Sequence, residues 1–319
     1  MQHFASLHQA QLKNAWLTIG AFDGVHLGHQ KILKELTAAA HSNQASAVVL
    51  TFFPHPVEVL RGPRNAFYLT SPQEKAERIA ALGIDALITH PFTQETVSIS
   101  ARDFVAQLKK QLDLQQLWVG HNFALGHNRE GDVPALRAFG ADLGFSVHLV
   151  EAVEVEGEVV SSSRIRALLA EGDIQTAARL LRRPYGFSGE VVTGANRGRS
   201  LGIPTANLKI WEKRAVPASG VYVTWVTLKN KRWGAVTNIG TRPTFDDKLA
   251  APVVETHILD YDGGDFYGQT LRLDFLARLR AEQRFDGVGA LLAQIQKDIE
   301  AARTVLTGQA VGWWNETLP

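Results

Sequence analysis

The sequence of 319 residues contains no cysteine and only one methionine. The lack of cysteine excludes disulfides, thiolate metal sites and cysteine nucleophiles, and it is compatible with a reducing compartment. No run approaches the roughly 18 uninterrupted apolar residues of a membrane span, and the longest apolar stretch, 47–53, has the length of a strand. The first twenty residues lack the basic and apolar regions of a signal peptide. We therefore expect a soluble, cytoplasmic protein with no membrane partner.

An excess of charge of one sign is also missing. Lysine and arginine total 33 against 32 for aspartate and glutamate, which gives a net charge of +1. This balance gives no compositional support for nucleic acid as a partner. Hydrophobic residues at 45% and charged residues at 20% exclude a disordered, collagenous or coiled-coil chain. The length is about twice that of a usual domain of roughly 150 residues, so we expect two domains.

The first half alternates short β-rich runs with segments of helical length. We expect strands at 15–21, 47–53, 86–89, 117–119 and 146–150, and helices after the first strand and at 74–82, 101–112 and 134–143. This alternation favours βαβ units and a parallel sheet. Such sheets bind ligands beyond the carboxyl ends of their strands, so the residues that follow each strand are the candidate site residues.

The pattern changes after Pro184. Four runs rich in β-branched and aromatic residues, 220–228, 232–239, 253–259 and 269–275, predict a compact antiparallel barrel. The apolar periodicity of 288–306 then predicts a terminal helix, with Asp286 available as its N-cap. We therefore expect one domain at 1–184 and a second at 185–319.

The sequence has neither a Gly-x-x-x-x-Gly-Lys-Ser/Thr phosphate loop nor a Gly-x-Gly-x-x-Gly dinucleotide fingerprint. Phosphate chemistry in the first half would therefore depend on the segment GAFDGVHLGH, which follows the first strand. In it His26 and His29 flank Gly28 where a helix should begin. Glycines and a helix N-terminus suit an anion, and imidazoles there can donate hydrogen bonds to phosphate oxygens. The alternative is a turn that carries two surface histidines.

Two further polar segments follow later strands. The stretch from Gly120 to Gly131 offers Asn122, His127 and Arg129 as donors, although it also matches an ordinary long turn. The segment TFFPHP, at 51–56, has prolines that stiffen a loop and a histidine on that loop. Taken alone, this second segment is better explained as a rigid loop than as a site.

The last polar element of the first half is SSSRIRALL, at 161–169. Its serines are N-cap candidates for a helix, and Arg164 and Arg166 fall in the first helical turn. Positive side chains oppose the helix dipole there, and an anionic ligand would reverse that effect. The segment therefore predicts either an anion site or a plain capped helix with solvated arginines.

The second half opens with YGFSGEVVTGANRGRSLGIPTANL, at 185–208. Its glycines create a loop that permits close approach and its arginines supply positive charge for phosphates; these residues are Gly194, Arg197, Gly198, Arg199 and Gly202. Thr205 and Asn207 follow as neutral oxygen ligands that suit Mg²⁺ beside nucleotide phosphates. A Gly/Arg surface loop that leads into a strand is the alternative.

Glu255 lies on the expected strand 253–259, where alternation places Val253, Glu255 and His257 on one face. A carboxylate in this setting can take a proton from a substrate hydroxyl. A solvated, outward-facing glutamate is the alternative explanation of the same pattern.

Taken in order, these motifs resemble those of bacterial bifunctional riboflavin kinase/FAD synthetases. GAFDGVHLGH, TFFPHP, VGHNFALGHNREG and SSSRIR resemble the nucleotidylyltransferase domain from about Trp16 to Arg183. PTAN, TNIGTRPTF, VETHILDYDGGDFYG and LRAEQRF resemble the riboflavin kinase domain to about Ala302. The resemblance implies a Rossmann-like α/β nucleotidylyltransferase domain followed by an antiparallel β-barrel riboflavin kinase domain that ends in a helix.

The resemblance also implies roles for named residues. His26 and His29 would act on the ATP phosphates as donors and sources of charge, while Glu255 would be the base of the kinase. Thr205 and Asn207 would bind Mg²⁺. The residues implied to bind nucleotide are Gly20, Phe22, Asp23, Gly28, Asn122, Arg129, Ser162, Ser163, Arg164, Arg166, Gly194, Arg197, Gly198, Arg199 and Gly202. The sequence departs from the family pattern at Leu125, where we expect an aromatic residue, and by one extra glycine within 262–265.

The expected function is therefore the phosphorylation of riboflavin to FMN by ATP, followed by the adenylylation of FMN to FAD with release of pyrophosphate. One alternative is a nucleotidylyltransferase for another phosphorylated acceptor, joined to an inactive kinase-like barrel. Another is a flavin-binding or regulatory protein that retains the fold without turnover.

Overall fold

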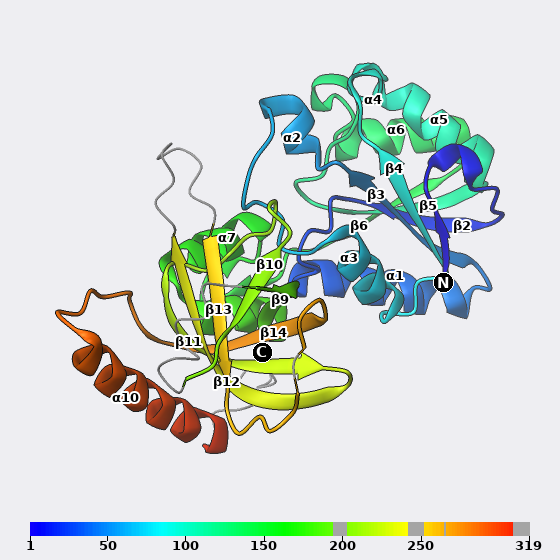
Figure 1. Ribbon diagram of the computed structural model, residues 1–319. Coiled ribbons are helices and arrows are strands. Elements are labelled where there is room, and N and C mark those ends of the chain that lie inside the picture. The colour runs from blue at the N-terminus through cyan, green and yellow to red at the C-terminus, as the bar shows by residue number, and fades with distance from the viewer. Residues whose placement is uncertain (194–202, 242–251, 265, 309–319) are drawn as a thin grey trace. The chain divides into compact units, whose positions relative to one another are not determined.

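A computed structural model describes residues 1–193, 203–241, 252–264 and 266–308 (Figure 1). The chain divides into two compact units, one of residues 1–64 and 70–162 and the other of residues 65–69 and 163–319. Helices α7 (Ser162–Glu171) and α8 (Ile174–Leu181) precede Pro184. The domain boundary at Pro184 stays a prediction, and the two units are described separately below.

The first unit is built on a six-stranded sheet in the order β1-β4-β3-β2-β5-β6. Its strands are β1 (Gln2–Phe4), β2 (Ala15–Ile19), β3 (Ser46–Phe53), β4 (Ala86–Pro91), β5 (Leu114–Gly120) and β6 (Ser146–Val150), and they pair in parallel. The parallel sheet predicted from the sequence is confirmed. The three-residue edge strand β1 was not expected, because so short a run has no readable periodicity.

Helices cover both faces of this sheet. On one face α1 (Leu27–Ser42) and α3 (Pro72–Ala80) bury Leu33, Leu36 and Ile79 against Val49 and Leu87. On the other, α5 (Ala101–Leu112) and α6 (Val133–Leu143) bury Phe104, Leu108 and Leu136 against Leu17 and Leu117. The short helices α2 (Pro56–Arg61) and α4 (Gln94–Ser98), the 3₁₀ turns η1 (Leu7–Gln9) and η2 (His127–Arg129), and the hairpin β7 (Glu154–Val155) and β8 (Glu158–Val159) complete the unit.

The strand order reverses at one position of the sheet, between β2 and β5. From β2 the chain runs to β3 and β4 on one side, and it later returns to place β5 and β6 on the other side of β2. Loops at the carboxyl ends of β2 and β5 therefore diverge to opposite faces, which is the arrangement that makes a ligand crevice in open α/β sheets. Residues 20–26 and 120–126 both begin where the strand order reverses.

The second unit is a closed barrel in the order β10-β13-β12-β11-β14-β9. Its strands are β9 (Tyr185–Val192), β10 (Ala206–Ile210), β11 (Gly220–Leu228), β12 (Lys231–Thr241), β13 (Pro252–Ile258) and β14 (Thr270–Arg280), and they pair antiparallel. The predicted antiparallel barrel is confirmed. Three buried hydroxyls join neighbouring strands, because Thr237 Oγ1 lies 2.7 Å from Thr224 Oγ1 and 2.9 Å from Thr256 Oγ1.

Helices also pack on the barrel. Helix α8 contacts β9 and β14, whereas α10 (Val288–Thr307) contacts β11, β12 and β14. The terminal helix is confirmed, but its expected cap is not. Its N-cap is Gly287, without a side-chain hydrogen bond, so Asp286 lies one residue too early to reach the first amides of the helix.

A five-residue segment from the first half of the sequence belongs to the second unit. Phe67 N donates to Lys213 O at 2.8 Å, and Ala215 N donates to Tyr68 O at 2.9 Å. The rings of Tyr68 and Trp211 lie 5.0 Å apart. Residues 65–69 are therefore held by the backbone of residues 211–215 within this unit.

Candidate functional site

The His-Gly-His motif forms the start of α1. His26 is the N-cap, and its Nδ1 accepts a hydrogen bond from His29 N at 3.4 Å. The two imidazoles stack with centroids 3.6 Å apart and an interplanar angle of 20°. A Cβ on Gly28 would lie 3.3 Å from the His26 ring, so the glycine leaves room for this stack. The predicted helix start is confirmed, and both histidines lie at its positive end.

The environment of His29 holds its imidazole in the neutral form. Burial lowers its pKa well below the usual value, and the charges of His26 and Lys75 lower it further. Phe22 packs edge-on to the ring with centroids 5.0 Å apart. The buried Nδ1 has no hydrogen-bond partner among the described residues. A neutral ring acts as an N–H donor, which differs from our expectation that His29 would supply positive charge.

The loop between β2 and α1 has an unusual backbone. Phe22, Gly24 and Val25 all have positive φ, at 47°, 81° and 43°. Left-handed backbone is costly for a β-branched residue such as valine and clusters at functional sites. Phe22 and Asp23 are each 2% exposed, so both side chains shape the loop from within the protein. Asp23 Oδ1 accepts from Thr70 N at 3.1 Å and from Thr70 Oγ1 at 3.2 Å.

The first residue of α7 adjoins this loop. Ser162 Oγ donates to the backbone oxygen of Asp23 at 2.8 Å. The structure therefore brings together Gly20, Phe22, Asp23, His26, Gly28, His29 and Ser162 of the predicted site.

The arginines that follow belong to the second unit. Arg166 Nε donates to Phe67 O at 2.7 Å, and its guanidinium lies 3.8 Å above the Phe67 ring. Arg164 is half-buried and Ser163 is exposed. Phosphate binding by these three residues stays a prediction.

The middle motif follows β5 at the point where the strand order reverses. Arg129 Nη2 donates to the backbone oxygen of Asn122 at 3.0 Å, and both residues are exposed. Leu125 exchanges two backbone hydrogen bonds with Gly131 and packs against the core, which gives this departure from the family pattern a packing role. Asn122 and Arg129 thus lie on the loop that follows β5, the strand next to β2 in the sheet.

The second site lies on one face of the barrel. In the strand register Glu255 of β13 pairs with Asn207 of β10 on one side and with Asn238 of β12 on the other. Directly paired residues project to the same face of a sheet with Cβ atoms about 5 Å apart. The carboxylate therefore stands in a row between two amides. Asn238 was not assigned a role from the sequence, because only the register reveals that it neighbours Glu255.

His257 lies on the same face as Glu255, as the alternation predicted. Both residues line one cavity together with Thr205. His257 Nδ1 donates to Pro204 O at 2.8 Å and so anchors the chain next to Thr205. Among the described residues no group of three His, Cys, Asp or Glu side chains could hold a metal ion. One carboxylate with Thr205 and Asn207 instead matches the sparse oxygen set that binds Mg²⁺ beside phosphates.

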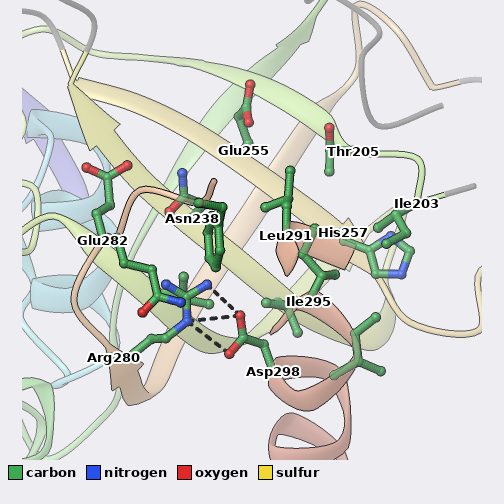
Figure 2. A pocket seen from close by; sticks show the side chains of 15 residues that line it. Ile203, Thr205, Asn238, Glu255, His257, Arg280, Glu282, Leu291, Ile295 and Asp298 are labelled. Atoms are coloured by element: carbon green, nitrogen blue, oxygen red, sulfur yellow. Dashed lines mark hydrogen bonds and ion pairs between the residues drawn. The ribbon is translucent and has the colours of Figure 1, made fainter. Parts of the chain in front are cut away.

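The cavity beside Glu255 has a volume of about 330 Å³ and is largely apolar. Its apolar wall comes from a strand, from α10 and from connecting segments: Ile203, Val221, Phe285, Leu291, Ile295 and Ile299. Figure 2 shows Glu255 and Thr205 at the upper rim and the ion pair of Arg280 and Asp298 at the lower end. The size and lining suit a flat organic ring system, with polar groups at its ends.

The ion pair ties α10 to the barrel. Arg280 Nη2 lies 2.7 Å from Asp298 Oδ2, and Arg280 Nε lies 3.0 Å from Oδ1. Gln294 Nε2 also donates to Asp298 Oδ1 at 2.9 Å. Asp298 is buried, so these contacts compensate the charge and fix the helix that forms one wall of the cavity.

Five predicted residues lie outside the described part of the chain: Gly194, Arg197, Gly198, Arg199 and Gly202. The extra glycine lies next to the undescribed residue 265, and Tyr261 Oη donates to Gly264 O at 3.2 Å. Within the described residues no helix has the length and hydrophobicity that crossing a membrane requires.

Comparisons with known proteins give matches in both halves. A family model described as FAD synthetase matches residues 8–164, and one described as riboflavin kinase matches residues 181–306. The bifunctional riboflavin kinase/FMN adenylyltransferase of Pseudomonas fluorescens is 37% identical over 313 residues, which are 97% of this chain and 99% of the relative. The proteins of the same name from Escherichia coli K12 and Bacillus subtilis 168 are 34% and 33% identical over 93% and 90% of this chain, and 95% and 90% of their own lengths.

One solved structure is similar along nearly the whole chain. A crystal structure of a protein from Streptococcus pneumoniae, described as a macrolide-efflux protein, gives a TM-score of 0.86 at 28% identity. The similarity covers 94% of this chain and 98% of that chain.

Proposed function

This chain belongs to the family of bifunctional riboflavin kinase/FMN adenylyltransferases, and we propose that the two sites described above carry its two reactions, one in each unit. The chain phosphorylates riboflavin to FMN with ATP and adenylylates FMN to FAD with a second ATP. The residues that bind the substrates and perform each step are our proposal. We also propose a cytoplasmic location, where ATP is available to both reactions.

In the kinase, the apolar cavity beside α10 receives the isoalloxazine ring and directs the ribityl chain toward Glu255. The 5′-hydroxyl oxygen of riboflavin attacks the γ-phosphorus of ATP, and ADP leaves. The Glu255 carboxylate accepts the proton of that hydroxyl. Asn207 and Asn238 flank the carboxylate in the strand register and restrict its orientation. This row of three residues, of which Glu255 and Asn238 line the apolar cavity, is the observation that carries the assignment.

The second site also suits Mg²⁺. Thr205 and Asn207 offer a hydroxyl and an amide oxygen, and neither must lose a proton to act as a ligand. When bound, the ion would neutralise charge that develops on the phosphates. His257 holds Pro204 and thereby keeps Thr205 in its place at the cavity.

In the adenylyltransferase, a phosphate oxygen of FMN attacks the α-phosphorus of ATP, and pyrophosphate leaves. An FMN phosphate is already an anion at neutral pH, so the site needs donors more than it needs a base. The neutral His29 ring and the amides at the start of α1 supply such donors, and Ser162 fixes the loop through its hydrogen bond to Asp23 O. The stacked histidine pair at the helix start carries this assignment.

A crossed experiment tests both sites in one chain. His29→Ala should lower FAD formation from FMN about 10²- to 10³-fold and leave FMN formation from riboflavin unchanged. Glu255→Gln should do the opposite. Each variant is incubated with ATP and Mg²⁺ and either riboflavin or FMN, and the flavins are separated by chromatography. Wild-type FAD formation by His29→Ala would remove the first assignment, and wild-type FMN formation by Glu255→Gln would remove the second.

A further inference from the structure

A lysine is buried beneath the loop that joins β2 to α1. Lys75 on α3 is only 7% exposed, although lysine is rarely buried without partners. Its Nζ donates to Ala21 O at 3.0 Å and to Thr51 Oγ1 at 2.9 Å. Thr51 Oγ1 in turn donates to the same Ala21 oxygen at 3.1 Å. Lys75 and Thr51 thus both donate to the backbone oxygen of Ala21 in the loop.

The loop needs such support because its backbone is strained. Residues with unfavourable φ cost about 1–3 kcal/mol each and persist only where the surrounding contacts fix them. Three of the four residues from Phe22 to Val25 have positive φ. Lys75 and Thr51 hold Ala21, the residue just before this strained stretch. Within the stretch, Thr70 Oγ1 accepts from Gly24 N at 3.1 Å. The chain just before α3 and α3 itself therefore restrain the loop at two points.

The charge of Lys75 also reaches the histidine pair. It is one of the causes that lower the pKa of His29. The charged and titratable groups that face the lysine are Asp23 from the loop and His29, beside His26, from α1, while β3 contributes the neutral Thr51. Burial lowers the pKa of Lys75 to about 8, and the nearby Asp23 opposes this shift.

We propose that Lys75 is a positioning residue of the adenylylation site, which holds the loop from Gly20 to Val25 in its phosphate-binding form and places a positive charge beneath it. The proposal rests on the assignment of this site to the adenylyltransferase. Lys75 lies below the loop and acts through Ala21 and Thr51. It therefore need not contact the substrate.

Lys75→Met tests this role, because methionine keeps an unbranched apolar stem and removes the ammonium group. We expect FAD formation from FMN to fall about 10- to 100-fold, since small displacements of binding groups have effects of this size. FMN formation by the same chain should stay within about twofold, because the barrel provides that site. Lys75→Arg retains a charge and should recover part of the activity. Lys34→Met, at an exposed lysine of α1, is the matched control and should change neither activity.

The pH profile separates a functional ammonium from a purely structural side chain. The dependence of kcat/KM on pH reports groups of the free enzyme. Lys75 is charged below its pKa of about 8, so kcat/KM for ATP in FAD formation should decline above that pH in the wild type. The profile of Lys75→Met should lack this decline, and that of Lys75→Arg should shift it to higher pH. A decline that persists unchanged in Lys75→Met would overturn the proposal.

Thr51→Val provides a second test if Lys75→Met fails to fold. Valine keeps the branched shape and removes the hydroxyl that Lys75 and Ala21 share, so FAD formation should fall about 5-fold. Wild-type FAD formation by Thr51→Val and by a folded Lys75→Met would overturn the proposal. If His29→Ala lowers FAD formation while these variants do not, only the role of Lys75 is wrong. If His29→Ala has no effect either, the site itself is wrongly assigned.

Discussion

The two sites hold their functional side chains in position in different ways. In the first unit the candidate phosphate donors lie at the start of a helix, which follows a loop with three left-handed residues, and buried polar side chains from other elements hold that loop. In the barrel the key residues lie on paired strands, where the ladder itself sets Asn207, Glu255 and Asn238 side by side. A site on a loop depends on its supporting contacts, whereas a site on a ladder depends on the stability of the whole barrel. Remote substitutions should therefore alter catalysis in the first unit and stability in the second.

The largest effect on stability is expected at Arg280, in the barrel. Arg280→Met leaves the buried carboxylate of Asp298 unpaired, which should lower the free energy of unfolding of the barrel by about 3 kcal/mol. Loss of kinase activity during urea unfolding, compared with loss of adenylylation in the same samples, measures this difference. Arg303→Met is the control, since the pair of Arg303 and Asp260 is exposed and should contribute little to stability.

One result for Arg280→Met would contradict this comparison of the two sites. If Arg280→Met left the kinase midpoint in urea unchanged while adenylylation became labile, the pair would not anchor the barrel.

A smaller effect is expected at the histidine stack. Gly28→Ala places a Cβ 3.3 Å from the His26 ring, so the ring must shift by a few tenths of an ångström. We expect adenylylation to fall about 10-fold with little change in thermal unfolding, because a displaced donor loses transition-state stabilisation. Steady-state rates of FAD formation check this, with FMN formation as the internal control. An unchanged rate of FAD formation would show that the loop tolerates displacement and does not require the precision we assign to it.

The smallest effect is expected from the buried hydroxyls of the barrel. Thr237→Val removes the central member of the chain from Thr224 to Thr256 and should cost about 1 kcal/mol of stability. The kinetic constants of the kinase should remain within about twofold, since the strand register stays intact. Urea unfolding and steady-state kinetics measure the two quantities. A tenfold fall in kcat without loss of stability would mean that the barrel site also depends on remote polar contacts.

Much of the architecture could be predicted from the sequence. Apolar runs marked the central strands of the sheet, and β-branched runs marked four strands of the barrel. Local spacing also placed His26 and His29 at a helix start, and alternation placed Glu255 and His257 on one face. These features follow from the periodicity of single elements.

Other parts of the sites could not be predicted, because they depend on contacts distant in sequence. In sequence Lys75 resembles a solvated helix lysine, and the one local signal against this is its place next to Ala76 on the apolar side of α3. Asn238 becomes a neighbour of Glu255 only through the pairing of β12 with β13. The Asp286 cap failed by one residue, since capping depends on where the first helical amide falls.

The segment Asn65–Leu69 has a consequence for how this chain can be divided. It is encoded in the first half but counts among the residues of the second unit, where it is held by residues 211–215. No single cut can therefore release residues 163–319 together with all of their packing partners. Gene truncation, circular permutation or exchange of halves between relatives would therefore have to carry two separate stretches of sequence to keep this packing.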